Sequence, residues 1–134
     1  MEETVKAEEA IKEHLLYKRI TSWDEERIVL EDGTTLDVEC FEQDCCASGG
    51  GEWSNVKLDA VITDIKLEDV KTDSYSGYDE SWTTAKIMIY HNQNIIAQND
   101  MYTNNGNAGY YYSVTGLLVT LPDNTELKGF EIDC

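Results

Sequence analysis

Most of this chain alternates apolar and polar residues, a period that predicts β-strands rather than helices. The alternation is clearest where Leu36, Val38 and Cys40 share one face and the acidic residues between them share the other. Successive side chains of a strand point to opposite faces, so such a segment buries one face and exposes the other. Segments that alternate, or that are rich in β-branched and aromatic residues, recur at 17–23, 27–30, 35–41, 60–70, 82–90, 95–102, 114–121 and 126–133.

The first residues follow a different period. Ala7, Ile11 and Leu15 recur every four residues and form a narrow apolar stripe, which is typical of an amphipathic helix. We therefore expect one α+β domain over residues 1–134, with an N-terminal helix at 1–16 and a β-rich body at 17–134. Because the connections are short, about seven strands should form a mostly antiparallel, curved β-sheet, either a sandwich or an open barrel.

Turn signals separate the expected strands. Asp32-Gly33 is a favoured type I′ pair and predicts a hairpin whose second strand runs into Cys40. The triplet Gly49-Gly50-Gly51 is expected to break regular structure, and residues 53–58 are expected to form a short helical turn. Polar loops are expected at 71–81 and 103–109.

The charge of the chain limits its partners. It has 27 acidic and 10 basic residues, for a net charge of −17. Such a field repels nucleic acids and anionic membranes, and it attracts basic protein surfaces or imitates a nucleic acid to a protein that binds one. High solubility is the simpler reading of the same composition.

Neither a membrane span nor a signal peptide is expected. The chain has no run of roughly 18 apolar residues, and its acidic, helical start is unlike a signal peptide. We therefore expect a cytoplasmic protein whose cysteines remain reduced, which favours metal ligation, buried thiols or redox chemistry over structural disulfides.

The cysteines are the most distinctive side chains of the sequence. We predict a structural zinc site with four thiolate ligands, which are Cys40, Cys45, Cys46 and Cys134. The fourth ligand remains open between Cys134, His91 and Asp44. Two other readings of the cluster also remain, namely buried reduced thiols that pack as small apolar groups, and a redox role.

A second group of residues predicts a protein-binding surface. Tyrosines on polar loops offer a large contact area at low entropic cost, and nearby carboxylates suit a basic partner. The residues assigned to this surface are Asp69, Asp73, Tyr75, Tyr78, Asp79, Glu80, Tyr110 and Tyr111. The alternative reading is that several of these tyrosines cover the edges of the core.

Catalytic motifs are not apparent in the sequence. The glycine triplet lacks the Lys-Ser/Thr pair of a phosphate-binding loop, and no His-Glu-x-x-His or calcium-loop pattern is present. A pair of Cys45 or Cys46 with His91 is conceivable, but nothing in the sequence orients the histidine. We therefore expect a protein that is not an enzyme.

The segment Phe41-Glu42-Gln43-Asp44-Cys45-Cys46 resembles an uncharacterised family of small phage and prophage proteins. Its features are a hairpin ending in Gln-Asp-Cys-Cys, an acidic strand, and an Asn-x-Gly-Tyr-Tyr segment. Here these correspond to 31–46, 60–70 and 107–111, and the resemblance covers roughly residues 16–120. Many relatives have a histidine shortly before the tetrad, where this chain has Phe41, and Cys40 would compensate for it as a ligand.

The resemblance implies a phage context rather than an activity. Small acidic phage proteins that inhibit host defence nucleases, including anti-CRISPR proteins, are similar in size and charge. The expectation is therefore an inhibitor in the host cytoplasm that occupies the basic surface of a host protein, specifically a Cas9-type RNA-guided nuclease. The alternative is a zinc-binding or redox accessory module of the phage.

Overall fold

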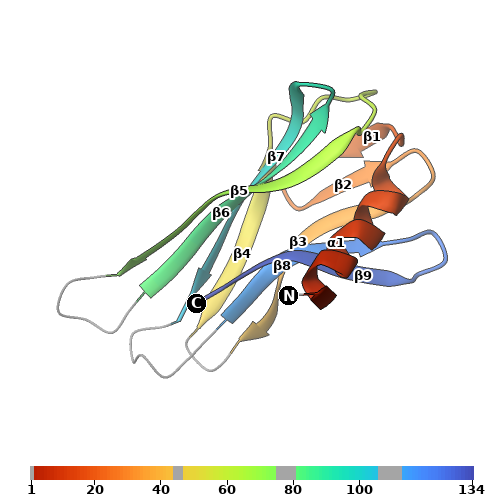
Figure 1. Ribbon diagram of the computed structural model, residues 1–134. Helices are drawn as coiled ribbons and strands as arrows, with labels where there is room; N and C mark the ends of the chain where they lie inside the picture. Colours follow the sequence, from red (N-terminus) through yellow and green to blue (C-terminus); the bar gives the residue numbers. More distant parts are fainter. Residues whose placement is uncertain (1, 44–46, 75–80, 106–112) are drawn as a thin grey trace.

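The computed structural model describes residues 2–43, 47–74, 81–105 and 113–134 (Figure 1). Within these residues the chain forms one helix and nine strands. In chain order they are α1 (Glu2–Leu15), β1 (Ile20–Trp23), β2 (Arg27–Leu30), β3 (Thr35–Gln43), β4 (Ser48–Ser54), β5 (Asp64–Ser74), β6 (Ser81–His91), β7 (Asn94–Asn104), β8 (Ser113–Thr120) and β9 (Glu126–Asp133).

The strands form two antiparallel sheets. One sheet has the order β1-β2-β3-β8-β9 and the other has the order β4-β7-β6-β5. The expected N-terminal helix and antiparallel β-rich body are confirmed, and the body consists of two sheets rather than a closed barrel. The expected count of about seven strands was too low, because the first arm of the hairpin is two strands and the glycine-rich segment is another.

The core lies between the two sheets. Its largest fully buried side chains are Trp53 and Phe130, which sit among isoleucines and leucines from both sheets and from the helix. Full burial of one such side chain contributes about 1.5–3 kcal/mol to stability. The indole of Trp53 donates a hydrogen bond of 3.2 Å from Nε1 to the carbonyl of Leu36, so β4 is also tied to β3.

Helix α1 closes one side of the two-sheet body. Its buried Ile11 lies against Gly129 of β9, and Lys12 Nζ is 3.4 Å from Asp64 Oδ1 at the start of β5. Both of these strands are at the edge of their sheets, so the helix spans the gap between them. The helix stops before Tyr17, which adopts φ 69° and donates from its backbone N–H to Ile62 O at 2.7 Å.

The glycine triplet was predicted to break regular structure, and this prediction was wrong. Gly49-Gly50-Gly51 lies inside β4 and pairs with Thr103, Tyr102 and Met101 of β7. The glycines serve close packing, because a Cβ on Gly49 would meet the Thr115 side chain and one on Gly51 would meet the Asn99 side chain. The predicted helical turn at 53–58 is also absent, since Trp53 and Ser54 are the last residues of β4.

The hairpin between β2 and β3 was predicted correctly, but its turn type was not. Gly33 has φ 93°, whereas Asp32 does not have a positive φ, and a type I′ turn requires both. Gly33 N–H donates to Leu30 O at 3.0 Å, and Leu30 N–H donates to Thr34 O at 2.8 Å. This arrangement is a type I turn followed by a glycine in the left-handed region.

Strand β5 also differs from its predicted range. It begins at Asp64 rather than residue 60 and continues to Ser74, so part of the loop expected at 71–81 is strand. Pairing with β6 carries the strand through these polar residues, and a bulge interrupts it between Glu68 and Lys71.

Candidate functional site

Most of the predicted site residues lie outside the part of the chain that the structure describes. These are Cys45, Cys46, Tyr75, Tyr78, Asp79, Glu80, Tyr110 and Tyr111, together with Asp44 as an alternative ligand. The described members of the predicted sets are Cys40, Cys134, Asp69 and Asp73.

Cys134 lies at the end of the molecule where residues 44–46 connect β3 to β4. Its backbone exchanges two hydrogen bonds with Ser113, at 3.1 and 3.3 Å, and Ser113 pairs on its other side with Gln43. The Cys134 thiol is 3.4 Å from Ser81 Oγ. Cys134 is therefore separated by a single strand from the residue that precedes this connection.

Cys40 has a different environment. It is half-buried, and its thiol donates to Glu42 O at 3.3 Å. It pairs with Thr115, which pairs in turn with Ile132, so β8 lies between Cys40 and the strand that ends near Cys134. Two strand spacings are about 10 Å, whereas ligand sulfurs of a tetrahedral zinc site are about 4 Å apart. The structure does not bring these two thiols together.

The described residues contain no group of three His, Cys, Asp or Glu side chains placed to hold a metal ion. His91 lies at the opposite end of β6 from Ser81, which is about 30 Å away along an extended strand. Its Nδ1 is 2.9 Å from Val61 O. His91 is therefore too distant to serve as the fourth ligand beside Cys134.

Asp69 and Asp73 are exposed residues of the edge strand β5. Asp69 lines a shallow hollow that it shares with Lys71 and Lys86, so the charge around it is mixed. This part of the predicted partner surface is less acidic than the sequence had suggested.

A more acidic surface lies at the opposite edge of the same sheet, on β4. Two grooves of about 460 and 440 Å³ run along this strand, and both are lined by Gly50 and Gly51. We call this surface the acidic edge, because six exposed carboxylates also line the two grooves. They are Asp24, Glu26 and Glu39 in the first groove and Glu25, Glu52 and Asp100 in the second.

The first groove contains one cation, and it is already engaged. Arg27 donates from Nε to Asp37 Oδ1 at 3.0 Å and from Nη2 to Asp37 Oδ2 at 3.2 Å. The hydrogen bond and the charge of Asp37 raise the pKa of Arg27 above its ordinary value. Arg27 is therefore engaged by Asp37, and the exposed carboxylates of Asp24, Glu26 and Glu39 outnumber it in this groove.

Tyr102 supplies an exposed aromatic ring to the second groove. Its side chain is 45% exposed, and its ring covers Gly50, where a Cβ would lie 3.5 Å from Tyr102 Cε1. A ring of this kind offers apolar contact area beside the carboxylates of Glu52 and Asp100. The sequence predicts a tyrosine-and-carboxylate surface, but the structure places the best described example on β4 and β7.

Sequence reasoning missed the acidic edge because its carboxylates come from four separate segments. The available signal was the glycine triplet, which was interpreted only as a break. Read as a strand, three successive glycines would have indicated close approach by another chain.

Comparison with known proteins places most of the chain in one family. Residues 13–118 match the family described as a domain of unknown function, DUF7448. The chain belongs to this family. The DUF7448 match begins in α1 and ends in β8, and it includes every residue of the acidic edge. No curated protein and no solved structure matches the chain.

Within residues 2–43, 47–74, 81–105 and 113–134, no helix has the length and apolar character needed to cross a membrane.

Proposed function

We propose that this protein acts by binding, and that the acidic edge docks a basic partner protein. More specifically, the protein is proposed to be a phage-encoded inhibitor in the host cytoplasm. It would occupy the basic surface of a defence nuclease of the Cas9 type, which is guided by RNA. The observation that carries the proposal is the gathering of six exposed carboxylates around Gly50 and Gly51.

Electrostatics supports a protein partner rather than a nucleic acid or a membrane. An RNA-guided nuclease holds its heteroduplex in a positively charged channel, which a compact carboxylate surface can occupy. The net charge of −17 steers such a partner and repels phosphates. Screening over a Debye length of about 8 Å at physiological salt makes the association sensitive to ionic strength.

The proposal is tested by pulling down a Cas9-type nuclease with the tagged protein from a nuclease-treated lysate. We expect recovery in near-equal amount, loss at high salt, and inhibition of DNA cleavage by the purified protein. Absence of the nuclease from the pulled-down material would contradict the proposal that a Cas9-type nuclease is the partner.

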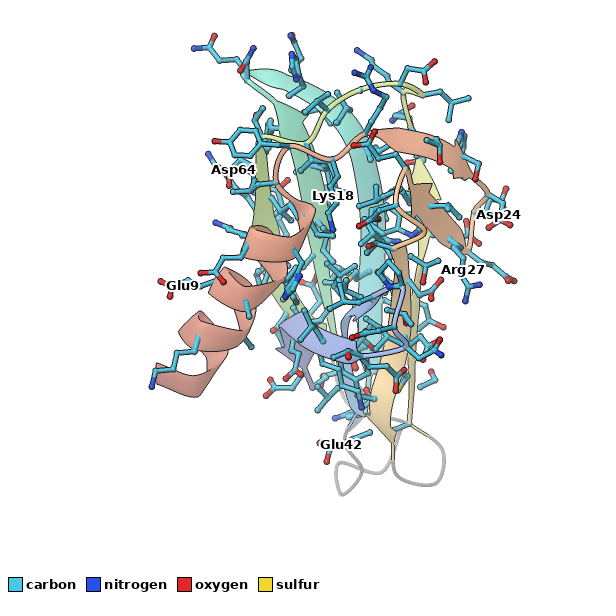
Figure 2. The ribbon with its side chains drawn as sticks, turned by 90° about the vertical axis from the view of Figure 1, so that its right-hand side faces the viewer. Glu9, Lys18, Asp24, Arg27, Glu42 and Asp64 are labelled. Carbon is cyan, nitrogen blue, oxygen red and sulfur yellow. The ribbon has the colours of Figure 1, made fainter. Side chains whose placement is uncertain are left out.

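Charge-reversal variants locate the binding surface. Glu39→Lys with Glu52→Lys alters both grooves of the acidic edge, whereas Glu9→Lys with Glu13→Lys makes the same charge change on exposed positions of α1. Figure 2 shows Glu9 on the helix and Asp24 and Arg27 on the other side of the body. We expect only the first pair to weaken nuclease binding strongly, and equal weakening by both pairs would reject the acidic edge.

A second candidate, a zinc-binding or redox module, is favoured by the position of Cys134 beside Ser113 and Ser81. In this proposal Cys45, Cys46 and Cys134 supply thiolates, and Cys40 lies on the far side of β8. Replacing Cys45 and Cys46 by Ser should release bound zinc and lower the melting temperature. Unchanged metal content and stability would contradict it, and slow thiol labelling of the native protein would reject the redox form.

A further inference from the structure

The outer edge of β4 has backbone groups without a neighbouring strand. β4 is the last strand of its sheet. Trp53 N–H donates to Glu25 O at 2.9 Å, so this N–H points away from β7. Backbone groups alternate in direction along an antiparallel strand, and those of Gly51 and Gly49 therefore point to the same outer side. No described residue pairs with them there.

The neighbouring sheet leaves space beside this edge. β2 begins at Arg27, which pairs with Asp37, so β3 has no described strand on that side from Val38 onward. The groove of about 460 Å³ lies between this part of β3 and Gly50-Gly51. An extended chain can reach the backbone of β4 along the groove, because the side chains of a strand project to the two faces of the sheet and leave its edge to the backbone groups.

The two grooves match the geometry of an added strand. Successive side chains of a strand point to opposite faces, so a strand beside β4 sends alternate side chains into the first and second grooves. Carboxylates line both of them, and Tyr102 adds an aromatic surface to the second. Such an occupant needs lysine or arginine side chains on both faces.

Charge also decides against self-association through this edge. Natural edge strands avoid pairing by means of lysines, prolines, bulges or short length. β4 is seven residues long, and its sequence Ser-Gly-Gly-Gly-Glu-Trp-Ser has neither lysine nor proline. A second copy of the chain would bring another set of carboxylates against the first, whereas a basic strand would neutralise them.

We propose that the acidic edge accepts an extended, lysine- or arginine-rich segment of the partner as an added strand on β4, paired with the backbone of Gly49 and Gly51. This inference rests on the proposed function, because it names the part of a basic partner that the acidic edge binds. Main-chain hydrogen bonds supply affinity in this mode, and the alternate grooves supply specificity.

The test uses a labelled peptide with the repeat Lys-Lys-Val-Val, about eight residues long, so that lysines lie on both of its faces when it pairs with a strand such as β4. A second peptide carries N-methyl groups on two adjacent central backbone nitrogens, which blocks both of its edges. A third carries the two methyl groups on lysine Nζ atoms instead, so that its mass and charge equal those of the second. Only the second loses backbone donors.

We expect the unmethylated and side-chain-methylated peptides to bind with similar affinity at low salt. Backbone methylation should weaken binding about tenfold, which corresponds to about 1.4 kcal/mol. Binding should also slow the exchange of the Gly49 and Gly51 amide protons, and Glu39→Lys with Glu52→Lys should weaken it far more than Glu9→Lys with Glu13→Lys. Strand addition on β4 would be contradicted by any one of three results. These are equal affinities of the two methylated peptides, unchanged exchange of the Gly49 and Gly51 amide protons, and absence of peptide binding.

The two proposals fail in different ways. Recovery of the nuclease together with equal affinities of the methylated peptides would reject strand addition and retain the proposed function. If the pull-down recovers no nuclease but backbone methylation still weakens peptide binding, the nuclease is rejected as the partner and strand addition is retained.

Discussion

Among single residues, Asp32 shows how a carboxylate at a turn stabilises the fold. Its Oδ1 accepts from Thr34 N–H at 2.9 Å, and its Oδ2 is 2.6 Å from Lys18 Nζ. Burial raises the pKa of Asp32, but hydrogen bonds from Lys18 and Thr34 outweigh it and lower the pKa to about 2. The charged form of Asp32 is therefore favoured by the native structure.

This lowered pKa predicts a dependence of stability on pH. A depressed folded-state pKa contributes stability above the ordinary value of 3.8, and that contribution is lost as the pH falls toward about 2. Because Asp32 is partly exposed, we expect Asp32→Asn to cost only about 1 kcal/mol at neutral pH and nothing below pH 2. Urea unfolding between pH 2 and neutral pH measures the free energy of unfolding of the native protein and of Asp32→Asn, with Glu31→Gln as a control. A difference between the native protein and Asp32→Asn that does not change with pH would contradict the lowered pKa of Asp32.

The glycines of β4 make a second prediction about single residues. A Cβ on Gly51 would overlap the Asn99 side chain and lie 2.9 Å from Val38 Cγ1, whereas a Cβ on Gly50 would make an ordinary contact with the Tyr102 ring. Gly51→Ala should therefore lower stability by about 1–3 kcal/mol. Gly50→Ala should change it by less than about 0.5 kcal/mol. Equal effects in urea unfolding would show that packing does not explain the glycine at 51.

Individual side-chain roles were only partly predictable. The alternation in β3 correctly assigned Leu36 to the core. It could not show that Asp37 is 6% exposed and bound by Arg27, because Arg27 comes from the neighbouring strand. A buried carboxylate requires such a partner, and the partner is set by strand register.

At the scale of elements, α1 owes its position to a small contact surface. Ile11 and Leu15 are fully buried, and Gly129 provides the space that Ile11 occupies. Most of the stability of a helix this short comes from packing of its apolar face rather than from intrinsic propensity. The helix therefore depends on β9 for its docking.

Ile11→Ala should remove this contact and leave a cavity under the helix. We expect a loss of about 2–5 kcal/mol in the free energy of unfolding. Glu9→Ala, on the exposed side of the same helix, should change stability by less than about 0.5 kcal/mol. Urea unfolding followed by circular dichroism measures both, and a small effect of Ile11→Ala would indicate that α1 is not part of the cooperative fold.

Elements with strong local signals were predicted well, and those that depend on pairing were not. The helix and the β2–β3 hairpin have a clear period and a turn signal. β4 has neither, because its glycines have low strand propensity, and it exists through pairing with β7. The acidic edge was missed for the same reason, because it forms only when β4 pairs with β7 beside β3.

For the whole molecule, the excess of negative charge opposes compaction. The net charge is −17, and only three ion pairs are present among the described residues. At low ionic strength, repulsion between the carboxylates acts over distances comparable with the protein itself. Salt should therefore stabilise the folded chain even though it weakens association with a basic partner.

We expect the melting temperature to rise by several degrees between about 10 mM and 150 mM NaCl, as the Debye length falls from about 30 to 8 Å. Sucrose at equal osmolality separates screening from solute exclusion, and the rise should be smaller for Glu9→Lys with Glu13→Lys. A melting temperature that falls with salt would show that attractive ion pairs outweigh the repulsion.

The sequence by itself determined the β-rich class, the N-terminal helix, the first hairpin and the acidic character, because period, turn residues and charge are local or additive properties. The tertiary structure alone decided the division into two sheets, the separation of Cys40 from Cys134 by β8, and the position of His91 at the far end of β6. It also decided the meeting of carboxylates from the β1–β2 connection, β3, β4 and β7 around Gly50 and Gly51. These features depend on which strands pair and in which register, and pairing joins residues that are distant in the chain and carry no shared local signal.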